Sequence, residues 1–113
     1  MSAKTNIMYE YGAQKFWKWF KENEEWINNC TAKGKAAVVR AVDKKLKEAF
    51  PYIKGGFDFL LGFNQENGEF YFHHWGRKEL ICAGKALKKL MPTEVAKRWQ
   101  FFLDECPPFF ITR

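Results

Sequence analysis

Long apolar runs are missing from this sequence, and no stretch approaches the roughly 18 residues that span a bilayer. Residues 1–6 are polar, and no apolar run of signal-peptide length follows them. We therefore expect a cytoplasmic protein without a membrane partner. A chain of 113 residues with 47% apolar side chains has the size and the apolar content of one domain, so residues 1–113 are predicted to form a single domain.

Cysteine and histidine are scarce, which leaves little material for a catalytic or metal site. The cysteines, Cys30, Cys82 and Cys106, are odd in number and lack paired spacing, which favours reduced thiols over a disulfide framework. The two histidines, His73 and His74, are adjacent, and adjacent residues of a strand point to opposite faces. No metal site, cofactor or catalytic constellation is therefore indicated. One enzyme alternative stays open, a pair of His73 with Cys82 or Cys106.

Acidic residues are the minority, 13 against 19 Lys and Arg, which gives a net charge of +6. The excess belongs to residues 33–54 and residues 77–98, which each carry seven basic and two acidic residues. Residues 55–76 carry three acidic residues and no basic one. Basic segments attract acidic proteins as well as nucleic-acid phosphates, so both classes of partner are candidates.

Aromatic residues are abundant, at 19% of the chain, and many of them recur at helical spacing near the N-terminus. We predict a first amphipathic helix over residues 13–30. Asn23 and Glu24 fall in its apolar half, where each needs a hydrogen-bond partner because the burial of an unpaired polar group is costly. The pair either belongs to a binding site or, as is more common, anchors a neighbouring loop.

Two further helices are predicted. The second covers residues 34–50, after a break in which Thr31 is a candidate N-cap. Its side opposite the apolar stripe carries Arg40, Lys44 and Lys47. The third lies between Gly76 and Pro92, because proline ends a helix.

The strongest local signal is a pair of aromatic-rich segments, residues 57–63 and 69–75, joined through Asn67-Gly68. Asn-Gly is the preferred pair for a type I′ turn, so we predict a β-hairpin in which Phe63 pairs with Phe72. In the same register Leu60 pairs with Trp75. Alternation along the strands separates a core face from a second face. The second face carries Asp58, Leu60, Tyr71, His73 and Trp75.

A last strand is predicted over residues 98–104, which completes the order α-α-β-β-α-β. This order indicates an α+β fold, with a three-stranded antiparallel or mixed sheet and with the helices packed mainly on one face. Function would then lie on the uncovered face. An alternative is that this face is covered by the apolar segment Phe109, Phe110 and Ile111.

Residues 16–25, FWKWFKENEE, resemble the start of a family of small, uncharacterised bacterial domains. The first helix of that family carries an aromatic FW-WF element followed by ENE. The similarity continues through the hairpin, the following Lys/Leu-rich helix and Arg98-Trp99. It implies the same order of elements and no established activity. Residues 72–76, FHHWG, depart from the family pattern, which has serine or alanine there and ends in Asp-Gly.

These patterns favour a non-catalytic binding module with an inhibitor, immunity-type or adaptor role. The apolar side chains of the second face suit an interface, and the basic helices would attract an acidic protein partner. One alternative is a nucleic-acid-binding protein that uses the basic helices and the stacking aromatics, and another is a homodimer formed through the second face. The predicted binding residues are Asp58, Leu60, Tyr71, His73 and Trp75 of the sheet, together with Asn23, Glu24, Arg40, Lys44 and Lys47 of the helices.

Overall fold

The computed structural model describes residues 3–33, 36–63 and 66–107. In chain order its elements are α1 (Ala3–Glu22), α2 (Glu24–Lys33), α3 (Ala36–Ala49), β1 (Asp58–Phe63), β2 (Gly68–His73), α4 (Lys78–Leu90), α5 (Thr93–Ala96) and β3 (Trp99–Asp104). The fold is α+β. The predicted order α-α-β-β-α-β is confirmed, since α1 and α2 nearly form one helix and α5 is a single short turn.

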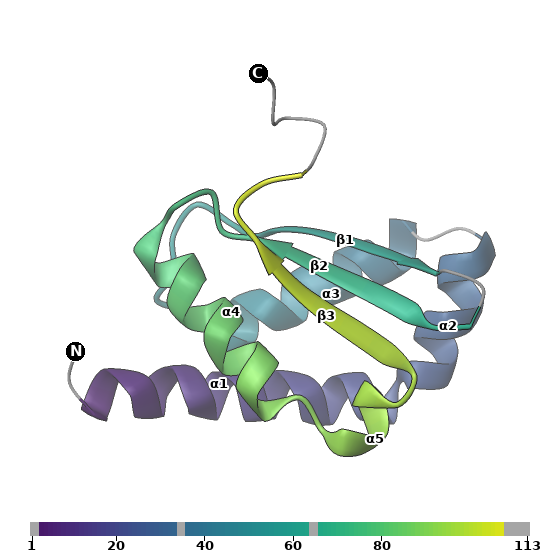
Figure 1. Ribbon diagram of the computed structural model, residues 1–113, viewed down its shortest axis with the longest axis horizontal. Coiled ribbons are helices and arrows are strands. Elements are labelled where there is room, and N and C mark those ends of the chain that lie inside the picture. Colours follow the sequence, from purple (N-terminus) through teal and green to yellow (C-terminus); the bar gives the residue numbers. More distant parts are fainter. Residues whose placement is uncertain (1–2, 34–35, 64–65, 108–113) are drawn as a thin grey trace.

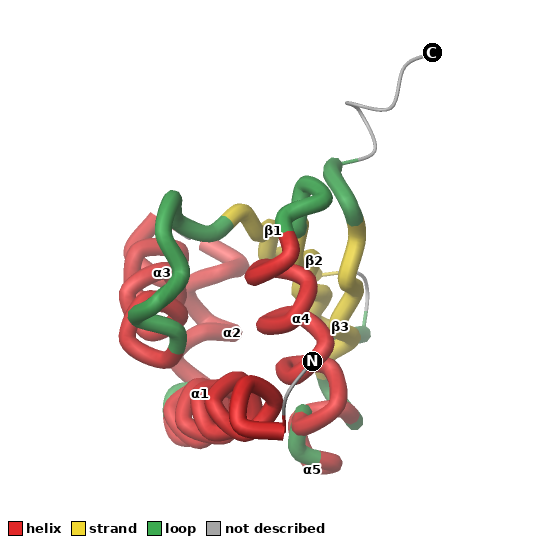
Figure 2. Tube along the Cα trace, turned by 90° about the vertical axis from the view of Figure 1, so that its left-hand side faces the viewer, coloured by secondary structure: helices red, strands yellow, loops and turns green. Residues whose placement is uncertain are grey.

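The three strands form one sheet in the order β1-β2-β3, and the helices gather on one side of it (Figure 1). Turned by 90°, the molecule shows α1 and α3 at the left and the strands at the right (Figure 2). No helix of the described chain covers the opposite face of the sheet, as the sequence predicts. The segment Phe109, Phe110 and Ile111, considered above as a cover for this face, lies outside the described residues. Within residues 3–33, 36–63 and 66–107, no helix is both long and apolar enough to cross a membrane.

Aromatic side chains of α1 fill the layer between the helices and the sheet. Trp17 and Phe20 are at most 1% exposed. The ring centroid of Trp17 lies 6.0 Å from that of Phe101, and the centroid of Phe20 lies 5.1 Å from that of Trp99. The Trp17 indole N–H also donates to the Leu87 carbonyl at 2.8 Å, which ties α1 to α4. Burial of each such ring stabilises the fold by roughly 1.5–3 kcal/mol.

The predicted first helix starts earlier, at Ala3, and bends at Asn23. The Asn23 side chain donates to the Trp19 carbonyl at 2.9 Å, and the Ile27 N–H donates to the Asn23 carbonyl, so hydrogen bonds continue across the bend. Helix α2 then runs through Thr31 to Lys33. The prediction of Thr31 as a cap is therefore wrong, because Ala32 and Lys33 favour helix and prolong α2 beyond it.

The hairpin forms, but its predicted register is wrong by four residues. Phe72 pairs with Phe59 instead of Phe63, and Phe63 pairs with Gly68. Because four is even, the side chains keep the faces that alternation assigns to them. Gly68 is the first residue of β2 and lies outside the turn. A Cβ atom on Gly68 would lie 2.4 Å from the Cδ2 atom of Trp99, so the glycine makes room for the indole ring.

Strand β3 runs parallel to β2, which makes the sheet mixed. Parallel neighbours need a crossover connection, and α4 and α5 supply it. The register pairs Tyr71 with Phe102 and His73 with Asp104. Trp99 and Phe101 face the helices, at 2% and 7% exposure, as strand alternation predicts.

Candidate functional site

Strand pairing arranges the side chains of the uncovered sheet face in three rows across the sheet. In the order β1, β2, β3 the rows are Asp58, His73 and Asp104; Leu60, Tyr71 and Phe102; and Gly62, Glu69 and Gln100. The middle row is apolar, and the two outer rows hold the polar groups. Residues from all three strands thus form one continuous surface, which we call the open face.

The middle row is a preorganised aromatic pair with an exposed leucine beside it. The rings of Tyr71 and Phe102 stack with centroids 4.7 Å apart and planes 14° apart. Leu60 is 43% exposed. The Tyr71 hydroxyl donates to Oε1 of Glu69 at 3.0 Å. Burial raises the pKa of Tyr71, and the hydrogen bond to the Glu69 carboxylate raises it further, so the phenol stays a neutral donor.

Trp75 also lies at this face, although it is not part of a strand and strand alternation does not account for its position. It lies beyond the end of β2, has a left-handed φ of 53°, and does not pair with Leu60. Its backbone N–H donates to the Glu105 carbonyl at 2.6 Å, and its indole N–H donates to Oδ2 of Asp58 at 2.5 Å. The indole is thereby held at the edge of the open face with 43% of its surface exposed.

His73 occupies the open face by register, yet it is fully buried. Its Nδ1 atom lies 3.6 Å from Oδ1 of Asp58, and neither ring nitrogen has a hydrogen-bond partner among the described residues. The predicted role of His73 as an accessible binding residue does not match this burial. A catalytic pair of His73 with Cys82 or Cys106 gains no support either, because no hydrogen bond links the His73 ring to a thiol among the described residues. The described residues also contain no group of three His, Cys, Asp or Glu side chains placed to hold a metal ion.

The open face is acidic. Asp58, Glu69 and Asp104 lie in its two polar rows. The three strands contain no Lys and no Arg. Their charge therefore differs in sign from the net charge of the whole chain, which is +6.

The basic residues predicted to flank the aromatic surface lie elsewhere. Arg40, Lys44 and Lys47 are exposed on α3, and Lys47 pairs with Asp43 at 2.9 Å. Helix α3 and the sheet occupy opposite sides of the molecule (Figure 2). The structure thus brings Asp58, Leu60, Tyr71 and Trp75 together but separates them from the predicted basic residues.

Asn23 and Glu24 both serve the fold. Asn23 holds the bend between α1 and α2, and Glu24 is only 7% exposed. The two carboxylate oxygens of Glu24 accept hydrogen bonds from Nε and Nη2 of Arg98 at 2.6 and 2.7 Å. The same bonds raise the pKa of Arg98. Because Arg98 directly precedes β3, the pair fastens the start of that strand to the helices, which is the anchoring role considered above.

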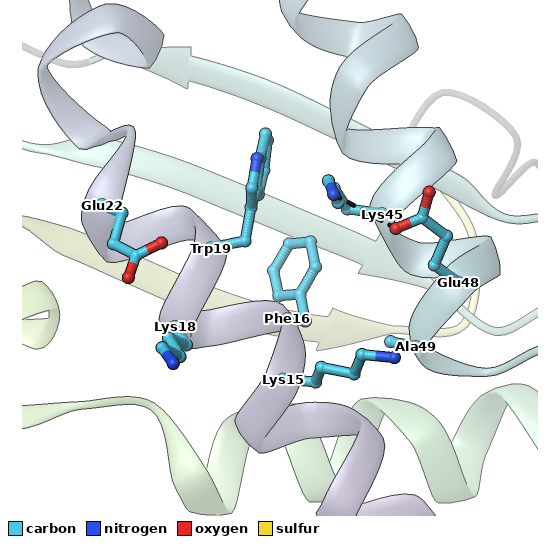
Figure 3. A pocket seen from close by; sticks show the side chains of 8 residues that line it. All are labelled: Lys15, Phe16, Lys18, Trp19, Glu22, Lys45, Glu48 and Ala49. Carbon is cyan, nitrogen blue, oxygen red and sulfur yellow. Dashed lines mark hydrogen bonds and ion pairs between the residues drawn. The ribbon is translucent and has the colours of Figure 1, made fainter.

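A second surface was not predicted, a groove of about 200 Å³ between α1 and α3 (Figure 3). It is lined by Lys15, Phe16, Lys18, Trp19, Glu22, Lys45, Glu48 and Ala49. The periodicity of the first helix places Trp19 in the apolar half, so the sequence marks it as core. The structure leaves the indole half-buried, because α3 does not close over it at this end.

Comparison with family models, with curated proteins and with solved structures finds no match to the chain. Function therefore has to be inferred from the chemistry of the two surfaces themselves. One is apolar at its centre and acidic around it. The other is a small groove with an aromatic floor and lysines along it.

Proposed function

We propose that the protein is a non-catalytic binding module that docks a protein partner on the open face. The observation that carries the proposal is the aromatic patch, which we define as Leu60, Tyr71, Phe102 and Trp75. These four side chains are exposed or half-buried on a sheet face that no described helix covers. Tyr and Trp are among the residues that interface cores prefer, and contiguous apolar surface of this kind marks interaction sites.

The patch is held in place before any partner arrives. Tyr71 stacks on Phe102, and its hydroxyl is bonded to Glu69. Trp75 is fixed by its bond to Asp58. Ordering a free side chain on binding costs about 0.5–1.5 kcal/mol, so a patch that is already ordered loses less affinity to this cost.

The charges around the patch define the chemistry of the partner. Asp58, Glu69 and Asp104 surround an apolar centre on strands without a basic residue. A partner with apolar side chains and a rim of Lys or Arg complements this pattern. An acidic partner, as the net charge of the chain suggests, would meet like charges here, so the proposal assigns a basic-rimmed partner to the open face.

A capture experiment with two matched double variants tests the proposal. Leu60→Ala/Tyr71→Ala removes one aliphatic and one aromatic side chain from the patch. Ile7→Ala/Tyr11→Ala removes the same two types from α1, where they are 64% and 66% exposed. Both variants are first shown to be folded by circular dichroism. We expect partners with basic surfaces to be lost with the first variant and kept with the second.

Two results of this experiment would contradict the proposal. Equal recovery of every partner by both folded variants would show that the patch is not the docking surface. Recovery of a copy of the same chain alone, together with a dimer in sedimentation that the patch variant abolishes, would replace the partner protein by self-association.

A further inference from the structure

The groove between α1 and α3 begins where the two helices separate. They approach each other closely at Gly12, where a Cβ atom would lie 2.4 Å from the carbonyl oxygen of Ala49. From Lys15 onwards on α1 the helices leave open space between them, and Phe16 and Trp19 point into it (Figure 3). Phe16 is buried, whereas Trp19 is half-buried, so the indole forms the accessible part of the apolar floor.

The size of the groove suits one side chain. Pockets for small molecules and cofactors occupy about 300–1,000 Å³, and this groove measures about 200 Å³. Nζ of Lys45 lies 5.9 Å from the centroid of the Trp19 ring, a cation–π distance that holds the indole in position. A flat or branched apolar side chain that enters the groove would cover the remaining face of the indole.

The polar rim of the groove carries free positive charge. Lys45 is paired with Glu48 at 3.1 Å. Lys15 and Lys18 are exposed on α1 and form no ion pair with any described residue. Arg40 and Lys44, which do not line the groove, are two further exposed basic residues of α3. An anionic occupant therefore gains charge pairs that the chain itself does not already make.

We propose that this groove binds an acidic segment of a protein, with one apolar side chain of the segment on Trp19 and its carboxylates at Lys15 and Lys18. Glu22 and Glu48 also line the groove, at its edges on α1 and α3 (Figure 3). A peptide with spaced carboxylates can avoid these two side chains. A nucleic acid, with its unbroken row of phosphates, cannot, so the observations favour an acidic protein over RNA or DNA.

This site is separate from the open face. The groove residues belong to α1 and α3, which lie on the helix side of the sheet (Figure 2), and the two surfaces share no residue. Failure of one proposal therefore leaves the other standing. Together the two proposals account for both the net charge of +6 and the acidic strands: the lysines of the groove bind an acidic partner, and the acidic residues of the open face bind a basic one.

The test measures the binding of short fluorescent peptides to the full chain by anisotropy. The probe is a glutamate-rich peptide with one central phenylalanine, and its two controls replace either the phenylalanine by glycine or the glutamates by glutamine. We expect the probe to bind at low salt and to bind more weakly as salt is added. We also expect both control peptides to bind at least about tenfold more weakly, since each lacks one half of the recognition.

Matched variants locate the site. Lys15→Glu/Lys18→Glu reverses two charges at the groove, and Lys78→Glu/Lys85→Glu reverses two exposed charges on α4. We expect the first pair to weaken binding at least about tenfold and the second to change it far less, because the net charge of both variants is the same.

A second matched pair of variants tests the contact between the probe and the Trp19 indole. Trp19→Leu keeps an apolar floor but removes the ring, and we expect it to weaken binding by about three- to tenfold. Trp26→Leu, at an indole 40% exposed on α2, serves as its control. The open-face variant Leu60→Ala/Tyr71→Ala is expected to bind the probe as the wild type does.

Three outcomes would overturn the proposal. The probe fails to bind at low salt; the two charge-reversal variants lose affinity equally, which indicates a diffuse field instead of a site; or an RNA oligonucleotide binds more tightly than the probe and depends on the same lysines. The last result would assign the groove to nucleic acid.

Discussion

Gly68 offers the sharpest test of how this fold is specified. A Cβ atom at this position would lie 2.4, 2.5 and 2.6 Å from three carbon atoms of the Trp99 indole, whereas nonbonded carbons pack at about 3.5–4.0 Å. Trp99 is 2% exposed and its ring cannot move aside without unpacking its neighbours. We expect Gly68→Ala to lower the free energy of unfolding by about 1–3 kcal/mol, the usual effect of overpacking a core. The opposing gain, from a less flexible unfolded chain, is only about 0.4–1 kcal/mol.

Urea denaturation followed by circular dichroism measures this change, and Gly62→Ala is the matched control. Gly62 lies on the neighbouring strand, and a Cβ atom there would meet nothing within 4 Å. The control is therefore expected to be neutral or slightly stabilising. In a Trp99→Leu background, where the indole is gone, Gly68→Ala should cost at least about 1 kcal/mol less than in the wild type.

Additivity of the Gly68 and Trp99 substitutions would refute this reasoning. Additive effects would mean that alanine at position 68 is disfavoured by the local backbone conformation and not by the Trp99 ring. The two-residue Asn67-Gly68 turn that the sequence suggests would be such a conformation. The same experiment thus decides whether the glycine serves a turn or a distant ring.

Three further predictions concern single side chains. His73→Leu should raise the free energy of unfolding in urea by about 1 kcal/mol, because both ring nitrogens are buried without a hydrogen bond in the described structure; a clear loss of stability would show that the ring has a partner. Burial, followed by the neighbouring Tyr9, raises the pKa of Tyr52 from 10.0 to about 12. The neutral phenol is thus favoured in the folded state, its stabilisation is complete below pH 10.0, and it is lost as the pH rises towards about 12. Tyr52→Phe should lose less stability over this range in urea titrations, and equal losses would contradict the assignment. Glu24→Gln leaves Arg98 without its carboxylate, so amide hydrogen exchange in β3 should become faster, and unchanged exchange would argue against the anchoring role.

The order of the elements could be predicted because it depends on local periodicity. Aromatic and aliphatic residues recur at helical spacing in α1, α3 and α4, and alternation sorts the strand residues into the correct faces. The register could not be predicted from local signals, because Asn67-Gly68 favours a tight turn, whereas in the structure Gly68 begins β2 and lies against the Trp99 indole, distant in the sequence. Likewise, the bend at Asn23 depends on a side-chain bond that periodicity does not reveal.

The candidate site was predictable in composition but not in arrangement. Alternation correctly places Leu60 and Tyr71 on the open face, but it does not reveal that Phe102 stacks on Tyr71, because that neighbour depends on the parallel pairing of β3 with β2. Trp75 reaches the face through a left-handed backbone and a bond to Asp58. The groove at Trp19 requires the relative placement of two helices, which no single segment of the sequence contains.

The separation of charge between the open face and the helices has a consequence for how the molecule approaches other surfaces. The strands contribute only negative charge, so the remaining chain carries more than the whole net charge of +6, and the molecule has an electric dipole along the axis from sheet to helices. Against an anionic surface this dipole would turn the helices inward and leave the aromatic patch facing solution. Captured on a cation exchanger, the protein should therefore still present the aromatic patch to a partner.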